Sequence, residues 1–250
     1  VTLTVKATLP DYIWTSPSHN SSESMPCGGG DIGLNVWVEN GDVLFYVARS
    51  GAFDENNTLL KQGRFRIRLN PNPFRNAIDF RQTLKLTDGS LEIVEGGTKI
   101  LFWVDVFKPV IHVEMQHKTA VVCEVRYENW RYQDRVIRKG EGQQNSYKWA
   151  VPHNLVMKKD SIVANANSVT FYHRNPETTI FDVTVHQQGL EVVKGELFNP
   201  LKYLTSGGKM WGKRLVFEGT ENGIYAETDY KAWIFKSRKP ARTHELNIAL

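Results

Sequence analysis

The sequence predicts an all-β protein, a large antiparallel β-sandwich, and three observations predict it. Apolar and polar residues alternate in many short segments, most clearly over residues 64–69 and 111–116, so that each segment has one buried face. Turn signals separate these segments, at residues 40–42, 88–89, 96–97 and 221–223. The segments follow one another too closely for the crossover helices of a parallel sheet. We therefore expect one sandwich domain over residues 1–250.

The expected strands run almost from end to end of the chain. They are residues 2–8, 32–39, 43–49, 64–69, 79–86, 91–95, 100–106, 111–116, 120–127, 168–173, 181–185, 214–219, 223–228 and 244–250. The alternation predicts that Phe65, Ile67, Leu69, Ile111, Val113 and Met115 point into the core. A short helix is expected from Asp54, and long loops over residues 139–167. The last strand pattern reaches Leu250, so either the sheet closes there or the natural protein continues.

Composition excludes several classes of protein. Hydrophobic residues make up 41% of the 250 residues and charged residues 23%, which is ordinary for a globular chain and not for a disordered one. The net charge of +4 is spread over the strands, so we expect no nucleic-acid partner. The longest apolar runs, residues 100–104 and 120–123, are too short for a membrane span. No signal peptide is recognisable. Cys27 and Cys123 are expected to be unpaired, with Cys123 in the core.

One candidate site follows the glycines at residues 28–30. Asp31 stands where this loop meets a strand, and Asn35 and Trp37 then share one strand face. A tryptophan beside polar groups can serve as a platform for a sugar ring, whereas the simpler alternative is a tight turn followed by a half-buried tryptophan. We also consider that three glycines let a partner approach the loop closely, or that they fit around a neighbouring aromatic side chain. No phosphate loop is present.

A second candidate site lies at two strand ends. Trp130 has polar neighbours on both sides, and His173 with Arg174 precedes a loop. These side chains are further candidates for gripping a sugar, with an ordinary strand-end turn as the alternative. Trp103 lies inside a continuous apolar run and is expected in the core.

No residue is assigned a catalytic role from the sequence. His112 and Glu114 lie on one strand face, where a pair can do acid–base chemistry but is more commonly solvated. The histidines lack metal-ligand spacing, and the chain has no nucleophile or dinucleotide motif. We therefore expect neither a metal nor a cofactor.

The strings MPCGGGDIGLNVWVENGD, LFYVARSGAFDENNTLLKQGRFRIRLNPNPF and FWVDVFKPVIHVEM resemble a bacterial domain-of-unknown-function family, and FYHRN and FDVTVHQQGLE extend the resemblance. That family forms the N-terminal β-sandwich of larger proteins, followed by a helical barrel like that of inverting α-L-fucosidases. Pro26, Gly28, Gly30 and Gly33 match the loop Pro-x-Gly-Asn-Gly-x-x-Gly of those enzymes, but Gly29 replaces its asparagine.

The resemblance implies a supersandwich of the galactose-mutarotase type, in which the catalytic carboxylates belong to the helical barrel. The chain is then the N-terminal part of a longer periplasmic or extracellular protein, and its partners are carbohydrate and the C-terminal helical-barrel domain. Three functions follow. The first is an accessory domain of a glycoside hydrolase, the second a free-standing carbohydrate-binding module. The third is a mutarotase-like sugar epimerase, which needs a histidine and a carboxylate facing one cleft.

Overall fold

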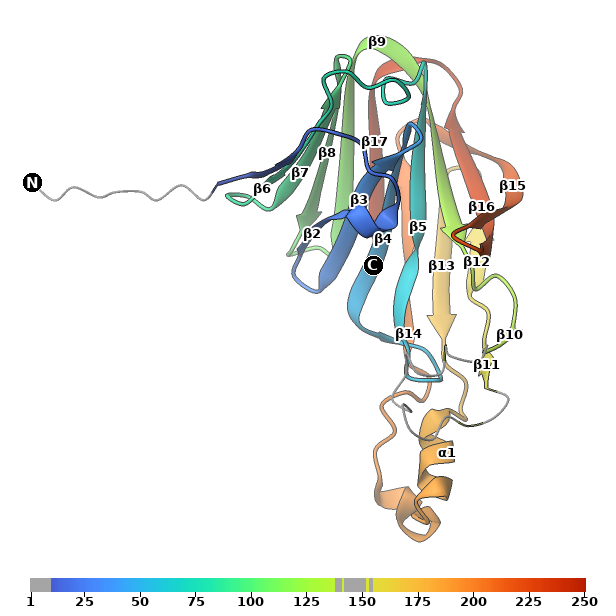
Figure 1. The fold of residues 1–250 in the computed structure, drawn as a ribbon. Coiled ribbons are helices and arrows are strands. Elements are labelled where there is room, and N and C mark those ends of the chain that lie inside the picture. The colour runs from blue at the N-terminus through green and yellow to red at the C-terminus, as the bar shows by residue number, and fades with distance from the viewer. Residues whose placement is uncertain (1–9, 138–140, 142–151, 153–154) are drawn as a thin grey trace, which may run out of the picture.

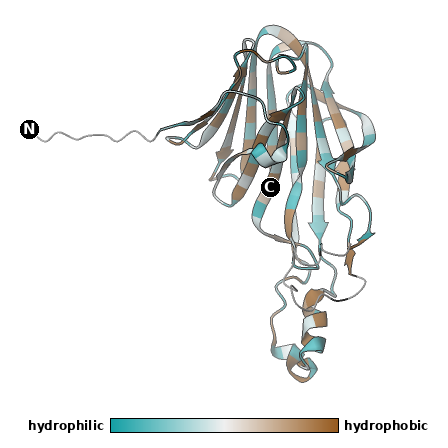
Figure 2. Ribbon diagram, in the orientation of Figure 1, coloured by the Kyte–Doolittle hydropathy of each residue, from teal (hydrophilic) through white to brown (hydrophobic). Residues whose placement is uncertain are grey.

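The computed structural model describes residues 10–137, 141, 152 and 155–250 (Figure 1). Among these residues the expected all-β, antiparallel architecture is confirmed, because 15 of the strands form one continuous sheet. Bands of opposite hydropathy alternate along most of its strands (Figure 2). The strand expected at residues 2–8 and much of the expected loop region at 139–167 lie outside the described residues.

The continuous sheet divides into two sheets that share one long strand, β9. Sheet A has the order β1 (Tyr12–Trp14), β6 (Arg81–Lys85), β7 (Ser90–Glu95), β8 (Thr98–Asp105), β9 (Val110–Asn129), β17 (Ala241–Ala249), β14 (Thr205–Gly212), β13 (Ser168–Arg174) and β12 (Ser161–Ala164). Sheet B has the order β2 (Met25–Gly29), β3 (Ile32–Glu39), β4 (Asp42–Phe53), β5 (Leu59–Asn70), β9, β16 (Thr228–Ser237) and β15 (Leu215–Tyr225). A separate ribbon pairs β10 (Arg135–Val136) with β11 (Val156–Met157).

Strand β9 passes from one sheet to the other. Residues 110–117 pair with β8 and residues 122–128 pair with β5. Between the two paired stretches, residues 118–120 are exposed where the strand arches over one end of the molecule (Figure 1). The two strands expected at 111–116 and 120–127 are therefore one strand of 20 residues.

The core lies between the facing sides of the two sheets. Phe45 of sheet B packs edge-on against Phe102 of sheet A, with ring centroids 5.2 Å apart, and Tyr127 stacks on Phe171 at 4.3 Å. All six residues predicted to point inward are 2% exposed or less. Cys123 is buried among them, and neither it nor Cys27 forms a disulfide.

Two local expectations were wrong. Residues 181–185 belong to helix α1 (Ile180–Gln187), because the Thr179 side chain accepts the Phe181 N–H and Asp182 accepts the Thr179 N–H, a capping box that outweighs the alternating pattern. Helix α1 and the 3₁₀ turn η3 (Glu191–Glu196) project from one end of the sandwich (Figure 1). At Asp54 there is no helix but the turn between β4 and β5. The Asp54 carboxylate closes this turn by accepting the backbone N–H groups of Asn56 and Thr58.

Smaller differences concern the last strands. The segment 223–228, expected as a separate strand, falls mostly within β15, and the turn that follows is made by Ala226 and Glu227, both with positive φ. A second 3₁₀ turn, η1 (Ser21–Glu23), precedes β2. In the part of the chain that the structure describes, no helix is long and apolar enough to cross a bilayer.

Candidate functional site

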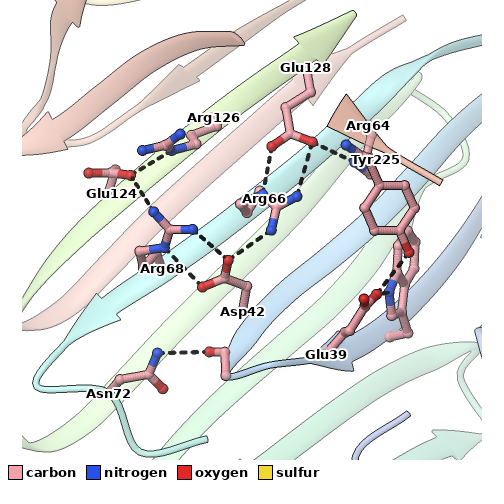
Figure 3. Close-up of polar contacts among 12 residues, drawn as sticks. Glu39, Asp42, Arg64, Arg66, Arg68, Asn72, Glu124, Arg126, Glu128 and Tyr225 are labelled. Atoms are coloured by element: carbon pink, nitrogen blue, oxygen red, sulfur yellow. Dashed lines mark hydrogen bonds and ion pairs between the residues drawn. The ribbon is translucent and has the colours of Figure 1, made fainter. Parts of the chain in front are cut away.

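Sheet B curls so far that strands near its two opposite edges come into contact. The Tyr225 hydroxyl, at the end of edge strand β15, donates a hydrogen bond of 2.8 Å to Oε2 of Glu39 on β3 (Figure 3). Five strand spacings separate these two strands in the sheet order, which amounts to roughly 24 Å in a flat sheet. The contact therefore makes the outer face of sheet B concave, and the hairpin of β15 and β16 covers part of it.

Charged side chains under this hairpin form a ladder of ion pairs (Figure 3). Glu128 binds both Arg64 and Arg66, and Asp42 binds both Arg66 and Arg68 at 2.8 Å. The ladder continues through Glu124 to Arg126. The alternation of arginines with the core residues of β5 predicts a solvated outer face, but the side chains of Arg64 and Glu128 are only 3% and 0% exposed. The prediction of a solvated outer face is wrong for these side chains, because the curl of the sheet covers them.

A cleft of about 470 Å³ opens at one end of the concave face. Its aromatic lining comes from four strands or strand ends: Tyr46 of β4, Trp130 after β9, Tyr225 of β15 and Tyr230 of β16. Trp130 is half-buried, and its ring meets Tyr46 edge-on at 6.0 Å. Trp37, which is buried, packs on Tyr46 with ring centroids 5.0 Å apart and so supports this side of the cleft.

Cationic groups lie against these rings. Lys61 Nζ is 4.3 Å from the centroid of the Tyr46 ring. The Arg64 guanidinium carbon is 3.8 Å from the centroid of Tyr225 and 5.0 Å from that of Tyr230. Such contacts stabilise a cation by about 0.5–2 kcal/mol each, depending on its desolvation. The cleft therefore combines aromatic surface with positive charge.

Behind one wall of the cleft lies a buried polar network centred on His173. Its Nε2 is 2.8 Å from Oε2 of Glu55, and its Nδ1 is 3.0 Å from Oδ1 of Asp160. Burial opposes the charged imidazole, but the hydrogen bonds and charges of the two carboxylates outweigh it and raise the pKa of His173 to about 9. Asp160 is buried as well, which alone would raise its pKa. The charge of Arg131 and the hydrogen bonds that Asp160 accepts keep that pKa below its usual value.

The network holds three segments around the cleft together. Arg131 binds Asp160 through two nitrogens and donates its third to the carbonyl of Lys61. Glu55 accepts the backbone N–H of Lys158, just after β11. Both ring nitrogens of His173 are occupied and the side chain is 1% exposed, so it offers no atom to a ligand and does not meet the requirement of an epimerase. No motif marks Glu55 or Asp160 in the sequence; only the fold brings them together.

Of the six residues predicted as carbohydrate contacts, Trp130 alone lines the cleft. Trp37 is 0% exposed, with its indole N–H bound to Glu39, and so has no surface for a sugar. Asp31 is exposed and pairs with Arg49 at 2.8 Å, and Asn35 donates to Ser24. These three residues lie along β3 and its preceding turn without forming a common site.

The two predicted residues at the end of β13 also lie on opposite faces of the sheet and do not share a site. His173 points into the buried network, whereas Arg174 is exposed, with its guanidinium 5.3 Å from the ring centroid of Tyr203. Strand alternation explains this, since successive side chains leave a sheet on opposite faces.

The glycines before Asp31 have neighbours within the same fold. Gly30 has a φ of +61°, as the turn between β2 and β3 requires. A Cβ on Gly29 would lie 2.9 Å from the side chain of Val106. The structure thus provides the close packing that we considered for this loop, although the neighbour is aliphatic and not aromatic.

The outer face of sheet A carries the remaining candidates. Trp103 is half-buried on this face and not in the core, because Phe102 takes the inward position. Its ring stacks on His112 at 4.0 Å and its indole N–H binds Glu114. His112 in turn contacts Asn247 at 2.7 Å, so His112 and Glu114 have separate partners and do not form an acid–base pair. No group of three metal-binding side chains is found among residues 10–137, 141, 152 and 155–250.

Fold and cleft together define a class: an antiparallel β-sandwich domain whose curled second sheet encloses an aromatic, cation-containing cleft. The comparison with known families is specific. Residues 13–250 match the model of a domain of unknown function (DUF5703), in its N-terminal part, so the chain belongs to this family. No curated protein matches the sequence.

Proposed function

We propose that this domain binds carbohydrate in the cleft and acts as an accessory domain of a glycoside-hydrolase-like protein. The observation that carries the proposal is the half-buried ring of Trp130 in an open cleft of about 470 Å³, with three tyrosines around it. This volume lies within the range of small-molecule sites. The apolar faces of sugar rings stack on aromatic side chains, while the surrounding polar groups take the hydroxyls.

The carboxylates of the cleft favour binding over hydrolysis. Asp54 is 2% exposed, and its Oδ1 accepts two backbone N–H bonds of its own turn. Glu141 pairs with Arg135 at 2.7 Å. Glycoside hydrolysis generally needs two carboxyl groups set apart across a sugar bond, one of them free to donate a proton. In this proposal the reaction belongs to a separate helical-barrel domain, as the family resemblance implies.

The binding proposal is tested by calorimetric titration of the protein and its Trp130→Ala variant with a panel of plant and bacterial oligosaccharides. We expect the variant to lose at least about tenfold in affinity, because it loses the stacking surface. Trp103→Ala is the matched control, since it truncates a half-buried tryptophan on the outer face of the other sheet. Unchanged affinity in Trp130→Ala would contradict the proposal, as would a folded wild type that binds none of the panel.

The accessory role has a separate test in the reading frame that encodes the domain. We expect a helical-barrel domain downstream in the same frame, and a signal peptide that directs the product to the periplasm or the exterior. A frame that ends after the sandwich would favour the free-standing carbohydrate-binding module.

A further inference from the structure

The cleft also indicates which chemical class of sugar it takes, an inference that rests on the proposed function. We propose that the ligand is an acidic saccharide, a uronate whose carboxylate is held by Arg64 and Lys61 while a sugar ring lies on Trp130. Two observations carry this inference: a buried guanidinium with unused donors, and a bulge that brings a second cation into the same cleft.

Arg64 is a buried cation with unused hydrogen-bond donors. Its side chain is 3% exposed and lines the cleft. Only its Nε has a hydrogen-bond acceptor in the described part of the chain, Oε2 of Glu128, and its two terminal amino groups donate to no acceptor there. Neither amino group is among the fully buried side-chain atoms that lack a partner, so both are accessible to a ligand in the cleft. Two parallel amino groups at the end of a guanidinium match the two oxygens of a carboxylate, and this arrangement makes a strong, oriented pair.

Glu128 does not fully neutralise Arg64, because Arg66 binds the same carboxylate. The Arg66 Nε is 2.6 Å from Oε1 of Glu128. The other two arginines of the cleft have their own carboxylates: Arg131 binds Asp160, and Arg135 binds Glu141. Arg64 is therefore the arginine of the cleft that remains available to a ligand.

Lys61 reaches the same cleft through an irregularity in β5. Residues 61 and 64 of a regular strand point to opposite faces. Here Tyr46 pairs with Arg64 and Ala48 with Lys61, while only Val47 lies between them on β4, so β5 contains one extra residue. Such a bulge moves the following side chains to the other face. It is made possible by Gly63, with a φ of +141° and no room for a Cβ beside Tyr127.

Lys61 is also free to bind an anion. Its side chain is exposed, and no ion pair involves it among the residues the structure describes. The acidic groups near it do not cancel its charge. Asp54 is 2% exposed and its Oδ1 is occupied by two backbone N–H groups of its own turn, and Glu141 is paired with Arg135. The cleft thus presents two available cations beside a stacking surface, which suits a sugar with a carboxylate on its ring.

The preference for an acidic saccharide is tested with matched pairs of ligands. Oligosaccharides from pectin, alginate, glucuronoxylan and chondroitin sulfate are titrated before and after chemical reduction of their carboxyl groups to alcohols. We expect at least one uronate to bind, and its affinity to fall at least tenfold after reduction. The affinity should also fall as salt is raised, because the new ion pairs are partly exposed.

Single substitutions test which side chain holds the carboxylate of the ligand. Lys61→Met keeps the aliphatic chain over Tyr46 and should lower uronate affinity several-fold without changing the affinity for a neutral oligosaccharide. Lys85→Met, on the outer face of sheet A, should change neither. Arg64→Met removes a partner of buried Glu128 and can impair folding, so Lys61→Met is the decisive variant.

The outcomes are distinguishable. Equal affinity before and after reduction, or an unaffected Lys61→Met, overturns the acidic ligand but leaves carbohydrate binding intact. Affinity that survives reduction and disappears on desulfation overturns the uronate in favour of a sulfate ester. A folded protein that binds no member of the panel, acidic or neutral, overturns the proposed function itself.

Discussion

Two carboxylates on the outer faces of the two sheets have the same local arrangement and different surroundings. Glu92 of sheet A lies between Lys85 and Lys99, and Glu128 of sheet B lies between Arg64 and Arg66. The lysine side chains are 31% and 46% exposed and Glu92 is 17% exposed. The arginines are 3% and 14% exposed, and Glu128 is not exposed at all. The difference arises because sheet B curls over its own outer face.

The choice of cation follows from this difference. A lysine ammonium is strongly hydrated and suits an exposed pair, whereas the planar guanidinium of arginine is less strongly hydrated and has several donors for sharing carboxylates. On sheet B Arg66 bridges Glu128 and Asp42, and Arg68 bridges Asp42 and Glu124, so that buried charges of opposite sign alternate along the ladder (Figure 3). The buried ladder is a rigid support for the cleft, and the exposed pairs of sheet A have no such role.

The largest expected effect is a difference in stability between variants at these two carboxylates. Glu128→Gln removes the charge that compensates two buried guanidiniums, and we expect it to lower the free energy of unfolding by about 3–5 kcal/mol. The same substitution at Glu92 should cost no more than about 1 kcal/mol, because solvent replaces the lost partner. Urea denaturation of both variants measures the difference. Equal losses would mean that the outer face of sheet B is as wet as that of sheet A.

A second expected effect concerns His173, whose charged form is stabilised by folding. Its pKa rises from 6.5 to about 9 on folding, so its contribution is fully present below about pH 6.5 and disappears as the pH rises through 9. The shift corresponds to a loss of about 3 kcal/mol over that range. His173→Gln cannot titrate and should not show this decline. The control is His186→Gln, because His186 is 82% exposed. A wild type equally stable at pH 6.5 and pH 9 would show that the imidazole is not charged in the folded protein.

The sequence predicted the strands and the inner layer well, because both follow from period two. Residues 32–39 form β3 as expected, and the inward side chains of β5 and β9 are buried. Where two local signals competed, the prediction was wrong. Residues 181–185 alternate like a strand, yet the capping box at Thr179 starts a helix there. Alternation alone carries no information on whether the second face of a sheet is covered.

The site was predictable only in part, for the same reason. Trp130 was identified from its polar neighbours, but Tyr46, Tyr225 and Tyr230 come from distant strands that meet only when sheet B curls. Trp37 has a similar polar setting in the sequence, and it is buried because Tyr46 and Tyr225 pack over it. Neither composition nor spacing distinguishes these two tryptophans. What separates them is the position of each strand in the sheet order.

The smallest expected effect tests the contact that closes the curl. Tyr225→Phe keeps the ring that packs on Arg64 and removes the hydroxyl that donates to Glu39. Burial raises the pKa of Tyr225, and the bond to Glu39 raises it further, so the phenol is a neutral donor at all physiological pH values. Because the ring is only partly buried, we expect a loss of about 1 kcal/mol in stability. The hairpin of β15 and β16 should also become more mobile, which hydrogen exchange at its amides measures. Tyr172→Phe, on the exposed face of β13, should change neither quantity. If Tyr225→Phe leaves hydrogen exchange in the hairpin unaltered, ring packing alone maintains the curl of sheet B. The bond to Glu39 then does not stabilise the curl.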